Sequence, residues 1–91
     1  MIKYETGSLA VSLAGHDKDD IFIILRVDGE YVYLVDGNLR KLDKPKRKNK
    51  KHIQIILRND EDLSRKLIDG TRVTDEEIRY FIRCYKRENQ V

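Results

Sequence analysis

Residues 21–35 read IFIILRVDGEYVYLV, which is two apolar runs joined by an Asp-Gly pair. In the first run, apolar side chains recur at every second residue from Ile21 to Val27, so these four side chains are predicted to share one face of a strand. The second run, Tyr31–Val35, is equally rich in β-branched and aromatic residues. An Asp-Gly pair between two such runs favours a type I′ turn, whose two central residues both need positive φ. Residues 21–35 are therefore predicted to form a β-hairpin.

Three more short strands are predicted around this hairpin. Residues 9–13 alternate between apolar and small side chains. Residues 39–42 follow a second turn at Asp36-Gly37-Asn38, and residues 53–57 (IQIIL) are again rich in β-branched side chains. Five short strands with tight turns in about fifty residues favour a small, closed, antiparallel barrel.

The rest of the chain changes to a helical period. Residues 74–77 match a capping box, in which a Thr hydroxyl and a Glu carboxylate each bind a free backbone N–H. A shorter apolar pattern covers about residues 61–68 and stops at Asp69-Gly70. The fold class is therefore mainly β with an α extension: a barrel over residues 5–57, then one short and one longer helix over residues 60–88. The apolar arc of the longer helix, expected to pack on the barrel, consists of Ile78, Phe81, Ile82 and Tyr85.

Positive charge is concentrated in residues 40–52, RKLDKPKRKNKKH. This segment holds eight of the nineteen Lys and Arg residues and a single acid, which gives it a formal charge of +7. Residues 1–39 carry −4 and residues 53–91 carry zero. Such concentration is typical of a surface that binds a polyphosphate. The predicted phosphate contacts are Arg40, Lys41, Lys44, Lys46, Arg47, Lys48, Lys50 and Lys51.

A basic run also occurs as a plain solvated loop, and lysines protect strand edges from aggregation. Eight like charges with one acid exceed what edge protection needs, so nucleic-acid binding is the preferred interpretation. If five of the eight contact phosphates, affinity for structured RNA should fall about 10²- to 10³-fold between 50 and 200 mM salt. In a simple meander, loops alternate ends, which would place the basic loop at the Asp28-Gly29 end, opposite the loop at Gly15.

Residues 11–18 (VSLAGHDK), followed by the apolar run and the Asp-Gly turn, resemble a KOW motif. The continuation YVYLVDGNLRKLDKPKRKNKKHIQ extends the match. Over residues 5–57 the chain is similar to small bacterial KOW-domain RNA-binding proteins, which are related to the KOW-bearing large-subunit ribosomal protein numbered fourteen of archaea and eukaryotes. The resemblance implies an SH3-like barrel, Gly15 as the motif's glycine, and association with ribosomes or translation. Ribosomal RNA and ribosomal proteins are the implied partners.

The loop after Gly15 departs from the usual motif. It reads His16-Asp17-Lys18-Asp19-Asp20, with a formal charge of −2. An acidic loop repels phosphate, so this loop is predicted to be peripheral to the RNA surface, with Lys18 as its only candidate contact. A second candidate contact surface is the row Arg79, Arg83 and Arg87 on the longer helix, which could equally be ordinary exposed arginines.

Tyr31 and Tyr33 share one face of a predicted strand. They either stack a base or pack, in the core or beneath the C-terminal helix. A lysine-rich loop without flanking Phe or Trp favours contact with the backbone of folded RNA over sequence-specific recognition of single strands.

Catalysis is not predicted, because no nucleophile stands beside a credible base and no Gly-rich phosphate cradle occurs. No cofactor or small-molecule substrate is therefore expected. The aspartates around His16 fit no metal-site spacing, and Cys84 has no second thiol. A cytoplasmic protein without a membrane partner is expected, since the chain has neither an apolar run of about eighteen residues nor a secretory signal at its start. The alternative function is an SH3-like protein-interaction module, an adaptor in transcription or translation.

Overall fold

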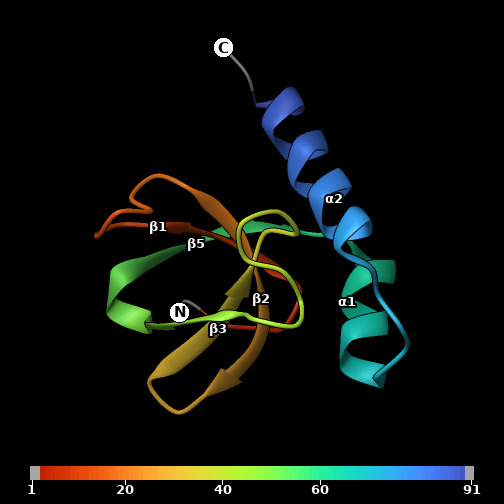
Figure 1. Ribbon diagram of the computed structural model, residues 1–91, viewed down its shortest axis with the longest axis horizontal. Helices are drawn as coiled ribbons and strands as arrows, with labels where there is room; N and C mark the ends of the chain where they lie inside the picture. Colours follow the sequence, from red (N-terminus) through yellow and green to blue (C-terminus); the bar gives the residue numbers. More distant parts are fainter. Residues whose placement is uncertain (1–2, 90–91) are drawn as a thin grey trace.

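The computed structural model describes residues 3–89. Within them, five strands form one antiparallel sheet in the order β4-β3-β2-β1-β5, and two α-helices follow the sheet in the chain (Figure 1). Strands β4 and β5 are the edges of this sheet. The elements are β1 (Ser8–Ser12), β2 (Ile21–Asp28), β3 (Tyr31–Val35), β4 (Lys46–Asn49), the 3-10 turn η1 (Lys50–His52), β5 (Ile53–Asn59), α1 (Glu61–Asp69) and α2 (Asp75–Glu88).

The predicted hairpin of residues 21–35 is confirmed, but its turn differs from the prediction. Asp28 pairs with Tyr31, so the central residues of the turn are Gly29 and Glu30. Of these two residues, only Gly29 has positive φ, at 59°. Positive φ at the first central position alone is the pattern of a type II′ turn, which requires Gly there. The type I′ prediction was therefore wrong.

A bulge in β2 changes the predicted face of Val27. The register of β2 against β3 shifts between Ile24 and Arg26, so one extra residue is inserted on the β2 side. Ile23 and Leu25 therefore face the helices, whereas Val27 packs against the apolar cluster on the opposite face. Strict alternation fails at this point because a bulge reverses the direction of every side chain that follows it.

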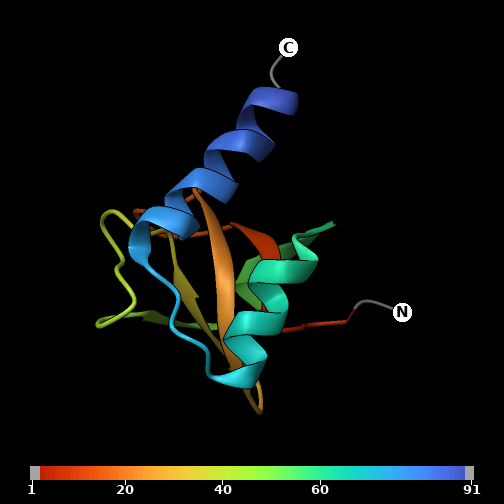
Figure 2. The same cartoon turned by 90° about the vertical axis from the view of Figure 1, so that its right-hand side faces the viewer.

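The sheet has an apolar cluster on each of its two faces. The inner cluster joins side chains of β1, β2, β3 and β5, so the sheet curves around it, and the outer cluster joins the sheet to both helices. Figure 2 shows the two helices lying in front of the strands. The inner cluster is Ala10, Phe22, Ile24, Val32, Leu34 and Ile53, and the outer cluster is Leu9, Ile23, Val35, Leu63, Ile78, Phe81 and Ile82.

Both predicted helices are confirmed, but only the Thr74 half of the predicted capping box forms, because the Glu77 carboxylate faces Lys66 at 3.7 Å instead of binding a backbone N–H. Thr74 Oγ1 accepts the N–H of Glu77 at 3.2 Å, and Asp60 does the same for α1. Gly70, with φ of 77°, ends α1 in the left-handed conformation. Three of the four residues of the predicted arc belong to the outer cluster and Tyr85 packs against it. No helix within residues 3–89 is both long and apolar enough to cross a membrane.

The prediction of a fourth strand at residues 39–42 was wrong. Residues 36–42 form a loop whose polar groups are satisfied locally and by α2, as the Asp36 carboxylate accepts the N–H of Arg40 at 2.8 Å. The N–H of Leu42 donates to Asp75 Oδ1 at 2.8 Å. The fourth strand is instead Lys46–Asn49, within the basic segment, and it pairs with β3. Strand β5 also runs two residues past the predicted end of the sheet at residue 57.

Gly37 holds this loop against α2. Its φ is 76°, and a Cβ there would collide with the carbonyl of Asp75 and with Arg79. We expect Gly37→Ala to lower the free energy of unfolding by about 2 kcal/mol, from backbone strain plus displacement of the helix. Gly29→Ala is the matched control, because Gly29 also has positive φ but nothing lies within 4 Å of its added Cβ. Equal losses for the two variants in urea unfolding would contradict a close approach at Gly37.

Candidate nucleic-acid interface

Three of the eight predicted phosphate contacts lie on strand β4, where consecutive side chains point to opposite faces of the sheet. Lys46 and Lys48 are the partners of Leu34 and Val32, both of which belong to the inner cluster. The two lysines therefore lie on the inner face of the sheet. Arg47 is the partner of Tyr33 and lies on the outer face.

Lys48 is held on the inner face by a complete set of hydrogen bonds. Its Nζ donates to Asp17 Oδ1 at 2.6 Å, to Ser12 Oγ at 2.6 Å and to the carbonyl of Ala14 at 2.7 Å. An ammonium group has three N–H donors, so each of them has a partner. The side chain of Lys48 is only 9% exposed. Lys46 Nζ lies 2.6 Å from the other carboxylate oxygen of Asp17.

Asp17 is thus the anion of a small internal charge cluster. Burial opposes its ionisation, but hydrogen bonds from Lys46, Lys48 and Ser12 outweigh burial and hold the pKa of Asp17 well below its usual range. Asp17 is therefore a carboxylate throughout the physiological pH range. Lys48 therefore has no N–H left for a phosphate, and Lys46, whose side chain is 27% exposed, already shares its charge with the same carboxylate, so both are less suited to phosphate than cations without such a pair.

The cluster also corrects the predicted placement of the Gly15 loop. The basic segment was expected at the Asp28-Gly29 end of the sheet, opposite this loop, unless it folded back along the barrel. Lys50 does lie at that end, because its N–H donates to the carbonyl of Glu30 at 2.8 Å, but Asp17 contacts Lys46 and Lys48 of the same segment. The loop and the segment meet because residues 46–49 form a strand, which places the side chains of Lys46 and Lys48 on the inner face, where Asp17 binds them. The sequence did not indicate this role of Asp17, because an acid in the loop at residues 16–20 predicts only that the loop repels phosphate, not that it binds lysines of a distant strand.

Two arginines lie over the rings of two tyrosines on the outer face of the sheet. The guanidinium carbon of Arg26 is 4.0 Å from the centre of the Tyr33 ring, and that of Arg47 is 4.3 Å from the centre of the Tyr31 ring. Neither tyrosine belongs to the inner or the outer cluster. The alternative in which they pack in the core or beneath α2 is therefore wrong, and they form a surface of their own.

The other predicted contacts lie on the loop before β4 and on η1. Arg40, Lys41 and Lys44 are exposed on a loop that Asp75 and Arg79 anchor to α2. Lys51 is exposed on η1, and Lys50 lies 5.0 Å from the ring centre of Tyr4. Among residues 3–89, ion pairs within 4.0 Å involve only Lys46 and Lys48 of the eight. The six without such a pair are Arg40, Lys41, Lys44, Arg47, Lys50 and Lys51.

The secondary candidates have different roles. Arg79 donates a hydrogen bond to the carbonyl of Gly37, so it joins α2 to the loop at residues 36–42. Arg83 and Arg87 are exposed on α2, and Lys18 is exposed beside Asp17. No contact within residues 3–89 brings Lys18 together with the α2 arginines.

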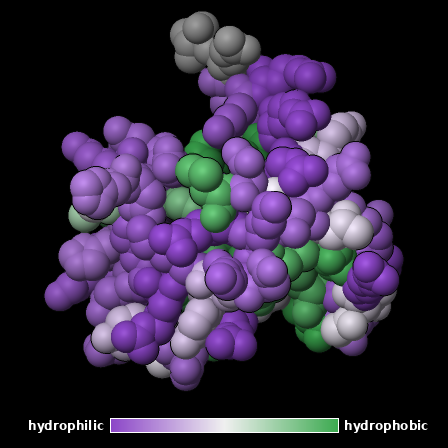
Figure 3. Space-filling view, in the orientation of Figure 1, coloured by the Kyte–Doolittle hydropathy of each residue, from purple (hydrophilic) through white to green (hydrophobic). Residues whose placement is uncertain are grey.

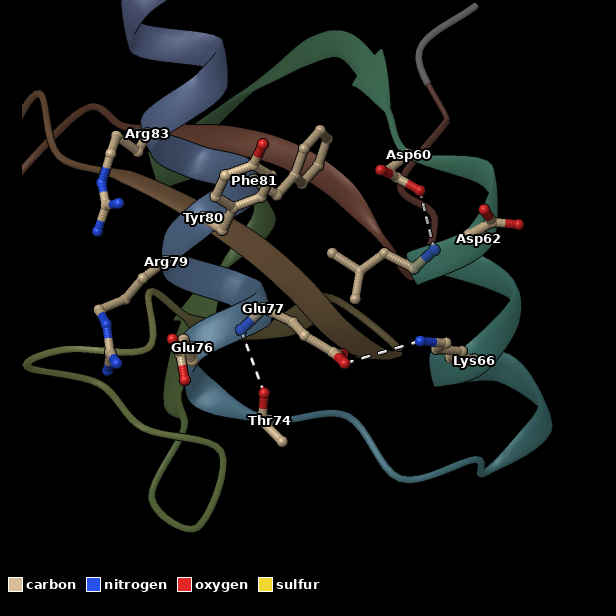
Figure 4. A pocket seen from close by; sticks show the side chains of 11 residues that line it. Asp60, Asp62, Lys66, Thr74, Glu76, Glu77, Arg79, Tyr80, Phe81 and Arg83 are labelled. Atoms are coloured by element: carbon tan, nitrogen blue, oxygen red, sulfur yellow. Dashed lines mark hydrogen bonds and ion pairs between the residues drawn. The ribbon is translucent and has the colours of Figure 1, made fainter.

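The groove between α1 and α2 is a poor site for an anion. It has a volume of about 590 Å³, and several carboxylates line it (Figure 4). Three cations, Lys66, Arg79 and Arg83, also line the groove, but four acids outnumber them and the carboxylate of Glu77 faces Lys66 at 3.7 Å. The acids lining the groove are Asp60, Asp62, Glu76 and Glu77.

Hydrophilic side chains cover most of the molecular face shown in Figure 3.

Comparison with protein-family models finds no match for this chain, and comparison with curated proteins finds none either. Within residues 3–89, no three His, Cys, Asp or Glu side chains gather as metal ligands would.

Proposed function

We propose that this protein is a non-enzymatic RNA-binding protein that holds the phosphates of structured RNA. The observation that carries the proposal is the separation of the basic segment into two lysines held by Asp17 and six cations without an ion pair among residues 3–89. If the segment only protected an edge strand, cations would be needed on β4 alone. Instead, Arg40, Lys41 and Lys44 extend the charge along an anchored loop, and Lys51 extends it onto η1.

The anchoring of these cations favours RNA of defined shape. Leu42 donates to Asp75, and Gly37 accepts a bond from Arg79, so the loop has a fixed base on α2. Cationic side chains on an anchored loop lose less conformational freedom on binding than those on a disordered tail. Contacts to phosphates position a protein on its target without reading the sequence. A folded RNA that matches the spacing of the cations is the partner that this surface fits.

The proposal includes an SH3-like KOW barrel and ribosomal RNA as the target. The strand order supports the barrel, because four strands run as a meander and β5 returns beside β1 around the inner cluster. The resemblance of residues 5–57 to KOW-domain proteins supports ribosomal RNA and a role at the ribosome.

Salt dependence tests this function against a protein-interaction module. With Lys46 and Lys48 occupied, we expect about four phosphate contacts, so affinity for a folded ribosomal RNA fragment should fall about 10²-fold between 50 and 200 mM salt. Fluorescence anisotropy of the labelled fragment measures this. A mainly apolar interface would lose little affinity over the same range. Absence of binding at 50 mM salt, or affinity that does not depend on salt, would contradict the proposal.

A further inference from the structure

Four side chains on the outer face of the sheet form two adjacent cation–π pairs, Arg26 with Tyr33 and Arg47 with Tyr31. We call these four residues the outer ladder. Three neighbouring strands supply them, since Tyr33 of β3 has Arg26 of β2 and Arg47 of β4 as its cross-strand partners. Energetically significant cation–π pairs occur about once per 70–80 residues. Two pairs side by side on one small surface therefore point beyond ordinary packing.

The geometry of the ladder suits a nucleobase. Each guanidinium carbon lies within 4.3 Å of a tyrosine ring centre, and Arg26 and Arg47 are both exposed to solvent. Bases stack on guanidinium planes and on aromatic rings alike. Because the side chains project from paired strands, the platform is already ordered before RNA binds, which lowers the entropic cost of stacking.

The groups around Tyr31 can also bind a base, because the positive charge of Arg47 over the ring is offset by Asp28 on the neighbouring strand. Asp28 is the cross-strand partner of Tyr31 on one side and Asn49 is its partner on the other. The Asp28 carboxylate repels phosphate but can accept a hydrogen bond from the amino group of a base. Asn49 already accepts the N–H of Lys51 through its side-chain oxygen, so its amide nitrogen is left to donate.

We propose that the outer ladder stacks unpaired bases, so that the preferred RNA carries a loop or bulge next to a helix. This inference rests on the proposed RNA-binding function. The loop and η1 cations hold the phosphates of the helical part, and Tyr31 and Tyr33 with their arginines receive bases that are free of pairing. Bases within an A-form duplex cannot reach the ladder, because they are already stacked and paired.

A single tryptophan provides a direct reporter of stacking. The chain contains no Trp, so Tyr31→Trp introduces a single tryptophan within the ladder, whose emission can be excited apart from that of the tyrosines. We would titrate this variant with two RNA hairpins that share one stem, the first with a three-nucleotide bulge and the second fully paired. Quenching of the Trp emission by the bulged hairpin alone is the expected result. Equal quenching by both hairpins, or by neither while both bind, would overturn the stacking proposal.

Affinities of leucine variants supply an independent measurement. We expect Tyr31→Leu with Tyr33→Leu to weaken binding of the bulged hairpin about 10-fold or more, and of the paired hairpin less than 2-fold. The salt dependence should stay the same, since no phosphate contact is lost. Tyr80→Leu is the matched control, because Tyr80 is 63% exposed on α2, outside the ladder. Equal losses for both hairpins would overturn the ladder's role.

The proposal of RNA binding and the proposal of base stacking are contradicted by different results. If the native protein binds neither hairpin at low salt, RNA binding itself is wrong. If it binds both hairpins equally and with steep salt dependence, phosphate binding stands and the stacking of bases is wrong. If the leucine variants fail to fold, the tryptophan titration still decides the matter.

Discussion

Replacing Asp17 by Asn is expected to lower the free energy of unfolding by about 3 kcal/mol at pH 7. The change leaves the ammonium groups of Lys46 and Lys48 without their counter-charge, and Lys48 is 9% exposed. Removing one partner of a fully buried ion pair costs about 3–5 kcal/mol, and the remaining exposure of this cluster places the loss at the lower end. Urea unfolding followed by circular dichroism measures it.

Asp19→Asn is the matched control for this variant. It removes the same charge from the same loop, but Asp19 is exposed and pairs with no cation among residues 3–89. Its backbone has φ of 74°, which Asn tolerates well. We expect a change within about 0.5 kcal/mol. If both variants were as stable as the wild type, the cluster would have no role in holding β4.

The effect of Asp17→Asn should depend on pH in a defined direction. The pKa of Asp17 is lower in the folded protein than the value of about 3.9 in the unfolded chain. A group with a depressed folded pKa stabilises the protein above its unfolded pKa, and this contribution is lost as pH falls towards the folded pKa. The stability gap between wild type and variant should therefore be complete at pH 7 and narrow below about pH 4.

Reversing three exposed lysines to glutamate is expected to weaken RNA binding about 10³-fold at 50 mM salt. The variant combines Lys41→Glu, Lys44→Glu and Lys51→Glu, three positions with exposed side chains and no ion pair among residues 3–89. Each lost phosphate contact costs about tenfold at this salt concentration and reduces the salt slope by about 0.9. Anisotropy with a folded ribosomal RNA fragment measures both quantities.

A second triple variant controls for net charge. Lys3→Glu, Arg65→Glu and Arg72→Glu also change the formal charge from +3 to −3, at exposed positions outside the basic segment. We expect less than a tenfold loss, from long-range repulsion alone. Similar losses for the two variants would show that binding depends on net charge and not on the basic segment. Lys46 and Lys48 are left unchanged, because a glutamate beside Asp17 would be expected to unfold the protein.

Much of this fold follows from local sequence patterns. The alternation over Tyr31–Val35 and the apolar arc of α2 relate residues that are two to four positions apart. The Thr74 cap relates residues that are three positions apart, since its hydroxyl accepts the N–H of Glu77. The concentration of charge in residues 40–52 is a property of the sequence as well. These signals do not depend on contacts between distant residues, which is why the hairpin, both helices and the basic segment could be predicted.

The allocation of those charges depended on contacts between distant residues. Asp17 and Lys48 are 31 positions apart, and Leu42 and Asp75 are 33 apart. Which basic residues pair with β3, and which face of β4 meets the Gly15 loop, is decided by the register of the sheet and by the docking of α2. The sequence determined that this protein has a β-rich body and one cationic segment. Only the tertiary structure decided which cations are held internally and which are exposed beside tyrosine rings, because strand pairing sets the direction of each side chain.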